Sequence, residues 1–321
     1  SVEVGWKSML YLTLTGRNDW ASQLANSSTS SFFYPSVGLS GVISEMIQMP
    51  SFIDYMKVRG SFSSVGMPYP RNLTSPTYEY NEATQSWKPK THYPIGDLKP
   101  ERTDSWEVGL DMKLFKDFNL GLSWYLANTF NQTFDPQISV SSGYTTIYLQ
   151  TGYVRNTGLE LSLGYGHTWN NNFRWDSNFT LSHNKNKIKE LVRDYVHPET
   201  GELINKDRLD VGGLGKARFI LKEGGTLGDL YTQSDLKRDD NGMVDIDPTG
   251  IVAIENNLPD IKLGSVFPKA NLAWSNHFSW KGISLSALFT ARIGGIVYSA
   301  TEAAMDQYGV SERSALARDN G

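Results

Sequence analysis

Hydrophobic and polar residues alternate with a period of two along most of this chain, and the pattern is clearest between Ser105 and Leu126. Every second position there is apolar, on both sides of a polar Lys116-Asp117 pair: Trp106, Val108, Leu110, Met112, Leu114, Phe118, Leu120, Leu122, Trp124 and Leu126. A period of two is that of a β-strand whose two faces meet different surroundings. The stretch therefore predicts a β-hairpin with one apolar face and one face rich in Gly, Ser and charge.

The same alternation recurs in about ten segments, and the connections between them are short and long in turn. Short connections are expected at Lys7, near Pro50, and at Lys116, Asn170 and Lys281. Aromatic residues bracket several of them: Phe115, Phe118, Trp169, Phe173, Phe278 and Trp280. Outer-membrane barrels combine short turns, long loops and aromatic girdles in this way. The pattern predicts an all-β fold, a partial antiparallel transmembrane β-barrel, although a soluble β-sandwich also has strands, turns and aromatics.

Three long segments break the alternation. Residues 67–99 are rich in proline, which cannot donate to a strand ladder, and predict a loop with exposed Tyr and Trp. Residues 129–156 form a second loop with aromatic side chains. Ile188 to Lys262 has little regular alternation and carries ten Lys and Arg against 15 Asp and Glu. Because long irregular segments inside a fold are usually functional, we expect a large functional loop there, opposite the short turns. We expect Glu223 to Tyr231, which contain three glycines, to be its ordered part and to fold back over the barrel mouth.

The amino-acid composition narrows the classes of fold, metal site and partner that the chain could have. The chain has 321 residues with Gly 29, Trp 9, Tyr 16 and Phe 14, a mixture that suits many strands, turns and aromatic anchors. Cysteine is absent, which excludes a disulfide framework and a thiolate zinc site. The net charge of -4 gives no reason to expect nucleic acid as a partner.

Two regions of the chain, its first residues and Ile283 to Ala300, bear on targeting and membrane insertion. Ile283 to Ala300 comes closest to a helical membrane span, but polar residues at alternate positions predict a strand instead. Strand spacing begins at Val2, with none of the basic and apolar regions of an export signal. We therefore expect that the chain starts inside a fold and is a fragment of a longer polypeptide.

Four motifs, in the order of the chain, carry a family resemblance. Residues 10–20 read LYLTLTGRNDW, residues 98–102 and 106–111 read LKPER and WEVGLD, residues 156–161 read NTGLEL, and residues 223–229 read EGGTLGD. Together they resemble the SusC/RagA family of TonB-dependent outer-membrane transporters of Bacteroidetes. The motifs are spread over most of the chain, which makes the resemblance specific.

The resemblance implies that residues 1–321 are part of one TonB-dependent receptor β-barrel domain, about ten strands of 22, with a plug in the complete barrel. The plug, the N-terminal region and the closing strands would lie outside this chain. It implies a location in the outer membrane of a Gram-negative, Bacteroidetes-like cell, in contact with lipid. It also implies active import of nutrient oligomers, glycans or possibly peptides, with a SusD-like surface lipoprotein and with TonB. We expect no enzyme and no catalytic or cofactor-binding residues.

Aromatic residues of the long loops are the candidates for contact with cargo or with the lipoprotein lid: Trp87, Tyr93, Tyr144, Tyr148 and Tyr153. For each of them a simple anchor of the loop is the competing interpretation, since Tyr and Trp are common interface residues. The competing function is a soluble all-β carbohydrate-binding module or a glycosidase. Carboxylate pairs such as Glu199 with Glu202 are better interpreted as solvated loop charges than as a glycosidase acid and base.

Two further motifs resemble loops that bind phosphate or calcium. Residues 212–216, GGLGK, fail as a phosphate loop, because Asp210 stands where the first Gly is required and Ala217 where Ser or Thr would bind magnesium. Residues 239–247, DDNGMVDID, resemble a calcium loop, but Lys237 and Pro248 occupy the first and twelfth positions of an EF-hand register. A turn is the favoured interpretation, with calcium in an extracellular loop as the alternative.

The alternation also assigns residues to the two faces of the predicted barrel wall. The lipid-facing set is Leu110, Met112, Leu120, Leu122, Leu161, Leu163 and Leu285. Glu107 and Asp111 occupy the opposite positions, and we expect them to face the water inside the barrel.

Overall fold

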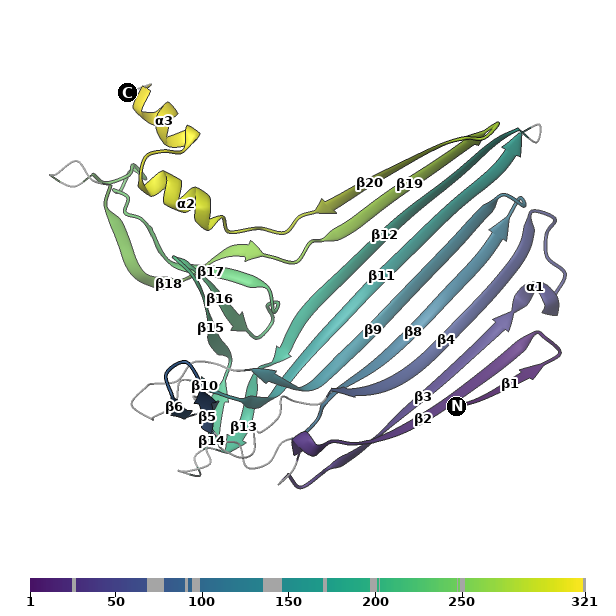
Figure 1. Cartoon of the computed structure of the whole chain (residues 1–321), viewed down its shortest axis with the longest axis horizontal. Helices are drawn as coiled ribbons and strands as arrows, with labels where there is room; N and C mark the ends of the chain where they lie inside the picture. Colours follow the sequence, from purple (N-terminus) through teal and green to yellow (C-terminus); the bar gives the residue numbers. More distant parts are fainter. Residues whose placement is uncertain are drawn as a thin grey trace.

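The computed structural model describes residues 1–24, 27–67, 78–89, 92–93, 99–134, 146–169, 172–196, 201, 203–246, 248 and 252–319. Ten strands form one antiparallel sheet in the order β1-β2-β3-β4-β8-β9-β11-β12-β19-β20 (Figure 1). Their bounds are Val2–Trp6 (β1), Leu10–Trp20 (β2), Ser31–Val42 (β3), Ile53–Met67 (β4), Glu101–Leu114 (β8), Phe118–Phe134 (β9), Leu149–Trp169 (β11), Phe173–Glu190 (β12), Ala270–Trp280 (β19) and Ile283–Ile293 (β20). The predicted fold class, part of an antiparallel barrel, is confirmed.

Short connections lie at one end of these strands, at the predicted positions. The connection near Pro50 contains the helix α1 (Ile43–Met46). Phe115 and Lys116, with φ of 50° and 66°, and Lys281 and Gly282, with φ of 44° and 89°, form two tight hairpin turns. Two consecutive residues with positive φ give the turn whose twist matches that of paired strands. The remaining connections lie at the other end and are long (Figure 1).

The register places the two residue types on opposite faces of the sheet. Leu110, Leu122 and Leu161 are direct cross-strand neighbours, and Leu181 and Leu272 continue the row. The next positions form a parallel polar row: Asp111, Gly121, Ser162, Thr180 and Ala273. Since side chains alternate across a strand, the first row lies on one face and the second on the other. The predicted division of the wall into an apolar and a polar face is confirmed.

Aromatic side chains on the apolar face form a continuous band near the short turns. Phe115 lies 6.5 Å from Phe118, and Phe118 lies 4.7 Å from Tyr165, measured between ring centroids. The band continues from Tyr165 to Trp175 at 5.3 Å and from Trp175 to Phe278 at 5.9 Å. An aromatic band at the end of the apolar face is the girdle that transmembrane barrels place at a membrane interface.

The described part of the segment between β12 and β19 contains several strands, and the expectation that it would have little regular structure was wrong. It contains β13 (Val192–Val196) paired with β14 (Leu203–Lys206), and a four-stranded sheet of β15 (Arg208–Leu214), β16 (Ala217–Lys222), β17 (Asp229–Leu236) and β18 (Ile254–Ser265). We call this four-stranded sheet the rim sheet. Register shifts in β15 and β17 break the two-residue period, so the sequence pattern could not show these strands.

The proline-rich segment also contains strands within its described part. A hairpin joins β5 (Tyr78–Asn81) to β6 (Ser86–Pro89), and β7 (His92–Tyr93) pairs in parallel with β10 (Thr146–Ile147). Pro89 is the last residue of its strand, where the missing N–H costs least. The prediction of a loop without strands was therefore wrong for this segment. The loop predicted at residues 129–156 was too long, because β9 continues to Phe134 and β11 begins at Leu149.

The main hydrophobic cluster among the described residues lies at the loop end of the wall. It joins residues of β9, β11, β12 and the rim sheet: Phe134, Ile147, Leu149, Val154, Ile188, Leu191, Val192, Leu209 and Leu221. Val154 and Ile188 are opposite each other in the register and are almost fully buried. Burying one such side chain contributes roughly 1.5–3 kcal/mol, so this cluster fastens the rim sheet to the wall.

Two helices follow β20, which ends at Ile293: α2 (Ala300–Gln307) and α3 (Glu312–Asp319). In Figure 1 they are drawn at the upper left, away from the ten-stranded sheet. The hydroxyl of Ser299 accepts a hydrogen bond from the backbone N–H of Glu302 and caps α2. Among the described helices, none has the length and hydropathy needed to cross a membrane.

Candidate functional site

The polar face of the wall is concave. A hollow of about 580 Å³ extends over it from β4 to β20. Its charged lining residues are Arg59, Asp111, Glu160 and Arg292, and Ser and Thr hydroxyl groups line much of the rest, together with Asn, Gly, Ala and Leu residues. A surface of this composition binds water or polar ligands and would be unfavourable in contact with lipid.

Arg59 on β4 holds the carboxylates of β8 together on this face. Its Nη2 lies 3.0 Å from Glu107 Oε1, and its Nη1 lies 3.3 Å from Asp111 Oδ2. The same guanidinium donates to Ser123 Oγ on β9. Glu107 and Asp111 therefore lie on the polar face, as predicted. Because all three charged side chains are about two-fifths exposed, each pair contributes at most about 1 kcal/mol to stability.

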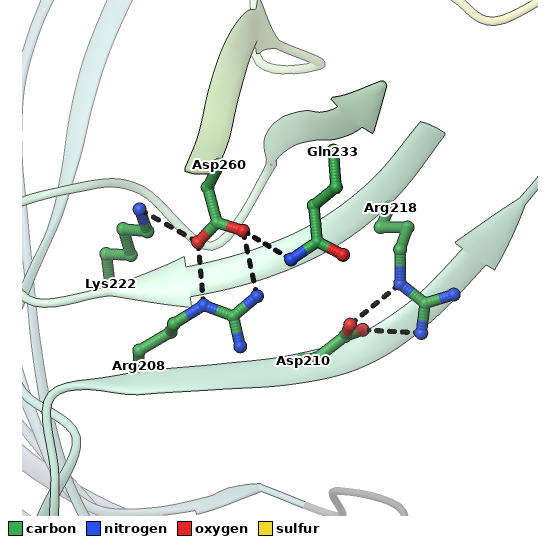
Figure 2. Close-up of polar contacts among 6 residues, drawn as sticks. All are labelled: Arg208, Asp210, Arg218, Lys222, Gln233 and Asp260. Carbon is green, nitrogen blue, oxygen red and sulfur yellow. Dashed lines mark hydrogen bonds and ion pairs between the residues drawn. The ribbon is translucent and has the colours of Figure 1, made fainter. Parts of the chain in front are cut away.

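The rim sheet contains a second group of charges, centred on Asp260 of β18 (Figure 2). Asp260 accepts hydrogen bonds from Nε and Nη2 of Arg208, at 2.6 and 2.9 Å, and from Nε2 of Gln233 at 2.9 Å. Lys222 Nζ lies 2.9 Å from the same carboxylate. Only 6% of the Asp260 side chain is exposed. This one carboxylate thus connects all four strands of the rim sheet.

The contacts of Asp260 change its acidity. The hydrogen bond from Arg208 holds the pKa of Asp260 far below its usual range, and Lys222 and Gln233 act in the same direction against the effect of burial. Beside it, Arg218 grips Asp210 with two hydrogen bonds, of 2.7 and 2.9 Å (Figure 2). Burial alone would raise the pKa of Asp210, but the hydrogen bonds from Arg218 and from the Gly212 amide outweigh it and lower the pKa.

The motif at residues 223–229 fastens the rim sheet to β12. The Gly224 amide donates to the Ile188 carbonyl, and the Ile188 amide donates to the Gly225 carbonyl, both at 2.8 Å. The Leu227 amide donates to Asn186 Oδ1 at 2.9 Å. Gly224 has a φ of 85°, a conformation that glycine adopts without the steric cost of a Cβ. The expectation that this motif is ordered and folds back onto the barrel end agrees with these contacts.

Asp229 is the last residue of this motif and lies buried beneath its turn. Its carboxylate is fully buried and accepts from the Thr226 amide at 3.1 Å and from the Thr226 hydroxyl at 2.6 Å. Lys262 pairs with the same carboxylate. Burial would raise the pKa of Asp229, but the hydrogen bonds from Lys262 and Thr226 lower it. An ionised buried carboxylate with all these partners has a structural role: it stabilises the turn from Thr226 to Asp229.

A smaller hollow of about 240 Å³ opens on the rim sheet. It is lined by polar side chains and one glycine: Gly215, Lys216, Arg218, Gln233, Ser234, Asn256 and Asn257. Lys216 Nζ donates to Asn256 Oδ1 at 3.0 Å. Residues 212–216, which failed as a phosphate loop, form the end of β15 and the turn into β16 beside this hollow.

The candidate calcium loop contains a turn. Asp239 Oδ1 accepts from the amides of Asn241 and Met243, both at 2.9 Å, and Asp245 pairs with Lys237 at 2.6 Å. Asp247 lies outside the described residues. Within the described part of the chain, His, Cys, Asp and Glu side chains do not gather in groups of three or more that could hold a metal ion. The turn agrees with the favoured interpretation, and calcium binding stays a prediction.

The three candidate aromatic residues whose side chains the structure describes have different packing partners. Trp87 is 66% exposed and packs against Tyr80 at 5.1 Å. Tyr148 packs against the buried Leu24 and Phe32. Tyr153 stacks on Phe130 at 4.9 Å, and its hydroxyl donates to Asn128. The backbone of Tyr93 lies in β7, while its side chain and the whole of Tyr144 lie outside the described residues. Contact of any of them with cargo or a lid stays a prediction.

Sequence reasoning missed the charged residues that organise the site. Asp229 could have been found, because it closes a motif already singled out. Arg59 lies opposite Gly109 on β8, two residues from each of the carboxylates it binds, so its partners follow from the register once β4 and β8 are paired. Asp260 follows an irregular stretch, and no local pattern marks it.

The wall geometry defines a class: a transmembrane β-barrel with a polar inside and an ordered structure over one end. Residues 2–209 match the family described as "TonB dependent receptor-like, beta-barrel". The chain belongs to this family, and it is a part of an outer-membrane barrel.

Curated relatives come from Formosa agariphila. TonB-dependent receptor P26 is 26% identical over 319 residues, which cover 92% of this chain and 31% of that receptor. TonB-dependent receptor P39 is 27% identical over 239 residues, which cover 72% of this chain and 21% of that receptor. This chain thus spans less than a third of the length of these two relatives.

Solved structures give the same fold. The RagAB peptide importer in its closed-closed state matches with a TM-score of 0.68 and 20% identity, over 91% of this chain and 32% of its own. The RagAB peptide transporter matches with a TM-score of 0.67 and 21% identity, over 90% of this chain and 32% of its own. At this identity the likeness shows the fold of the wall and the rim.

Proposed function

We propose that this chain is the wall and rim of a TonB-dependent receptor that imports nutrient oligomers, glycans or peptides, through the outer membrane. The observation that carries the proposal is the polar concave face of the wall, with the rim sheet fastened over its loop end by residues 223–229. A passage for polar cargo needs such a face, and a gate or docking surface needs an ordered structure at its mouth.

The ten-stranded sheet leaves β1 and β20 as edges. Unpaired backbone groups at a sheet edge in lipid are prohibitively costly, so further strands must close the barrel. We propose that residues 1–321 are one part of a single barrel domain, which the plug and the closing strands complete.

The short turns and long loops support an orientation. Barrels of this kind have short periplasmic turns and long extracellular loops, which supports a position of the rim sheet outside the cell. We propose that it contacts a SusD-like surface lipoprotein or the cargo, while TonB binds parts of the receptor that precede this wall. The acidic surface of the segment, ten Lys and Arg against 15 Asp and Glu between Ile188 and Lys262, favours a solvated docking surface over burial in lipid.

Cargo chemistry is supported by the rim hollow and by one neighbour. The amides of Gln233, Asn256 and Asn257 would bind the hydroxyl groups of a glycan or the peptide groups of a peptide equally well. The structural neighbour RagAB is described as a peptide importer. We assign the chain no catalytic role, because the carboxylates Asp210, Asp229 and Asp260 are all engaged by cations.

A soluble carbohydrate-binding module is the alternative. It would bury the apolar row of the wall against a second layer, yet Leu122, Trp124 and Leu163 remain between 36% and 42% exposed. Exposed apolar surface on this scale is the mark of an interaction with lipid or a partner.

Uptake tests the proposal. Cells with the intact receptor should take up labelled oligopeptides or oligosaccharides, and deletion of either the receptor gene or the TonB gene should abolish this uptake. The two cargo classes are compared in the same cells, which identifies the one that is transported. Uptake that persists without TonB would contradict the proposal.

Proteolysis tests the orientation. Lys237 and Arg238 are exposed in the connection between β17 and β18, directly after the end of β17. Trypsin added to intact cells should cut there after removal of the lipoprotein, and more slowly in its presence. Cleavage that requires opening of the outer membrane would show that the rim sheet lies on the periplasmic side.

A further inference from the structure

The outward face of β12 changes character along its length. From the short-turn end it carries Trp175, Ser177, Phe179, Leu181, His183, Lys185, Lys187 and Lys189. Trp175 stacks on Phe278 in the aromatic band, and Leu181 belongs to the apolar row of the wall. The column therefore runs from the lipid-facing region into Lys185 and Lys187, and the exposed Lys189 follows at the register shift where Glu190 pairs with Tyr153.

Burial confirms the direction of these lysines. Lys185, Lys187 and Lys189 are exposed, whereas Asn186 and Ile188 between them are buried under the rim sheet. Ile188 belongs to the hydrophobic cluster on the polar side of the wall. The three ammonium groups thus project from the opposite, outer side of the barrel.

Neighbouring strands show the same transition at the same height. Next to Lys185, the row continues through Thr157, Leu126 and Trp106. One row further from the short turns, Lys187 is followed by Arg155, Asn128 and Asp104. Apolar side chains give way to polar ones between these two rows, which therefore mark the edge of the lipid-facing band.

The height of the lysines fits the far membrane interface. From Trp175 to Lys185 the strand advances by ten residues, and at roughly 3.4 Å per residue and a tilt near 40° this is a rise of about 26 Å. The apolar band of such barrels is about 25 Å tall. With the aromatic band at the periplasmic interface, the lysines lie at the level of the headgroups of the outer leaflet.

The patch has an excess of positive charge. Among the ion pairs that the described residues form, none involves Lys185, Lys187 or Lys189. Arg155 adds a fourth cation beside Lys187. The carboxylates nearby on this face are Glu190, next to Lys189, and Asp104, which Arg102 already binds.

We propose that Lys185, Lys187, Lys189 and Arg155 form a binding site on the outer barrel wall for the phosphate groups of an anionic glycolipid of the outer leaflet. Each phosphate would accept hydrogen bonds from two neighbouring cations, while the acyl chains lie against the apolar column below them. The site orients the receptor in the membrane and is independent of which cargo the receptor carries.

Lipid titration tests this proposal. The whole receptor is purified in detergent, stripped of lipid and titrated with diphosphoryl lipid A, with occupancy measured by native mass spectrometry. The wild type should bind it, and should bind the same lipid much more weakly after removal of its phosphates. Replacing all three lysines by Gln should weaken binding by about fivefold per lysine.

Two matched variants separate a specific site from a general charge effect. Replacing the three lysines by Arg should restore binding, because the charge and the donors are kept. Replacing Lys7, Lys116 and Lys281, which are exposed in the short turns at the opposite end of the strands, by Gln removes the same charge and should leave binding unchanged. Resistance to SDS shows whether the Gln variant folds. If it does not fold, the proposal is tested by comparing how strongly the wild type and the Arg variant bind lipid A with and without its phosphates.

Three results would overturn the site: equal binding of the phosphate-free lipid, wild-type affinity in the folded Gln variant, or an equal loss in the control variant.

Discussion

At the scale of single residues, the side of the wall decides what a substitution costs. Leu122 lies on β9 in the apolar row, between Leu110 and Leu161. Arg at this position would place a charge in the lipid, and we expect Leu122→Arg to lower the free energy of unfolding by about 2–4 kcal/mol. Denaturant titration of the receptor folded into lipid vesicles measures the change.

Ser162→Arg provides the matched control, because Ser162 lies on β11 on the polar face, in the hollow with Asp111. The same charge there meets water and a carboxylate, and we expect a change below about 1 kcal/mol. A larger loss for Ser162→Arg than for Leu122→Arg would mean that the two faces have been exchanged.

The pH dependence of the rim sheet is set largely by Asp260. Its pKa in the folded state is lowered, chiefly by Arg208, so its stabilising effect is complete above the pKa of an unfolded Asp, near about 4. The effect is lost as the pH falls from there toward the lowered pKa. Hydrogen exchange in β15–β18, corrected for the intrinsic rate, should therefore rise below about pH 4.

Asp260→Asn is the corresponding variant. It removes the charge that Arg208 and Lys222 share, so we expect faster exchange of the rim sheet already at pH 7 and a weaker response to acid. An unchanged acid response in this variant would assign the effect to other carboxylates, such as Asp210 and Asp229.

Sequence alone predicted which residues share a face, because that follows from a period of two. It predicted the positions of Leu122 and Glu107 correctly, since both lie in long regular strands. It could not predict that Arg59 would bind Glu107 and Asp111, because that contact depends on the pairing of β4 with β8, 48 or more residues apart.

At the scale of elements, residues 223–229 control the docking of the rim sheet. Gly224 has a φ of 85°, and Gly224→Ala adds a Cβ in a conformation that costs about 1–2 kcal/mol. We expect the contacts with Ile188 to open more often, so that the Ile188 amide exchanges about 5 to 30 times faster. Hydrogen exchange measured by mass spectrometry on the peptide that contains Ile188 gives the change.

Gly242→Ala is the control for backbone strain. Gly242 has a similar φ of 82° and open space around its Cα, but it lies in the distal Asp239 turn. We expect faster hydrogen exchange in that turn and an unchanged exchange rate of the Ile188 amide. Equal effects of the two variants on Ile188 would show that residues 223–229 do not anchor the rim sheet.

The elements also show where sequence patterns stop being informative. The hairpin of β8 and β9 was predicted because its strands are long and unbroken. The rim sheet was missed because bulges interrupt its period and ion pairs, such as that of Arg208 with Asp260, replace apolar contacts. Only the glycine-rich motif at its centre revealed that this segment was ordered.

At the scale of the whole molecule, the wall is an open sheet with one face for lipid and one for water. The rim sheet covers one end, and the lysine column of β12 lies just beneath it on the outside. Family membership and the antiparallel sheet agree with the sequence prediction of a partial barrel. The proposed cargo was not predictable to the level of glycan or peptide, because the amide and hydroxyl groups that line the rim hollow would suit both.

Spin labelling tests the central claim, that the apolar rows face lipid and the polar rows face the inside of the barrel. The chain contains no cysteine, so single labels can be placed at Leu122 and Leu161 and, for the opposite face, at Glu107 and Ser162. In reconstituted receptor the first two should be relaxed strongly by oxygen dissolved in the lipid, and the last two only weakly. High oxygen accessibility at Glu107 and Ser162, with Leu122 and Leu161 exposed to a water-soluble nickel complex, would contradict the account.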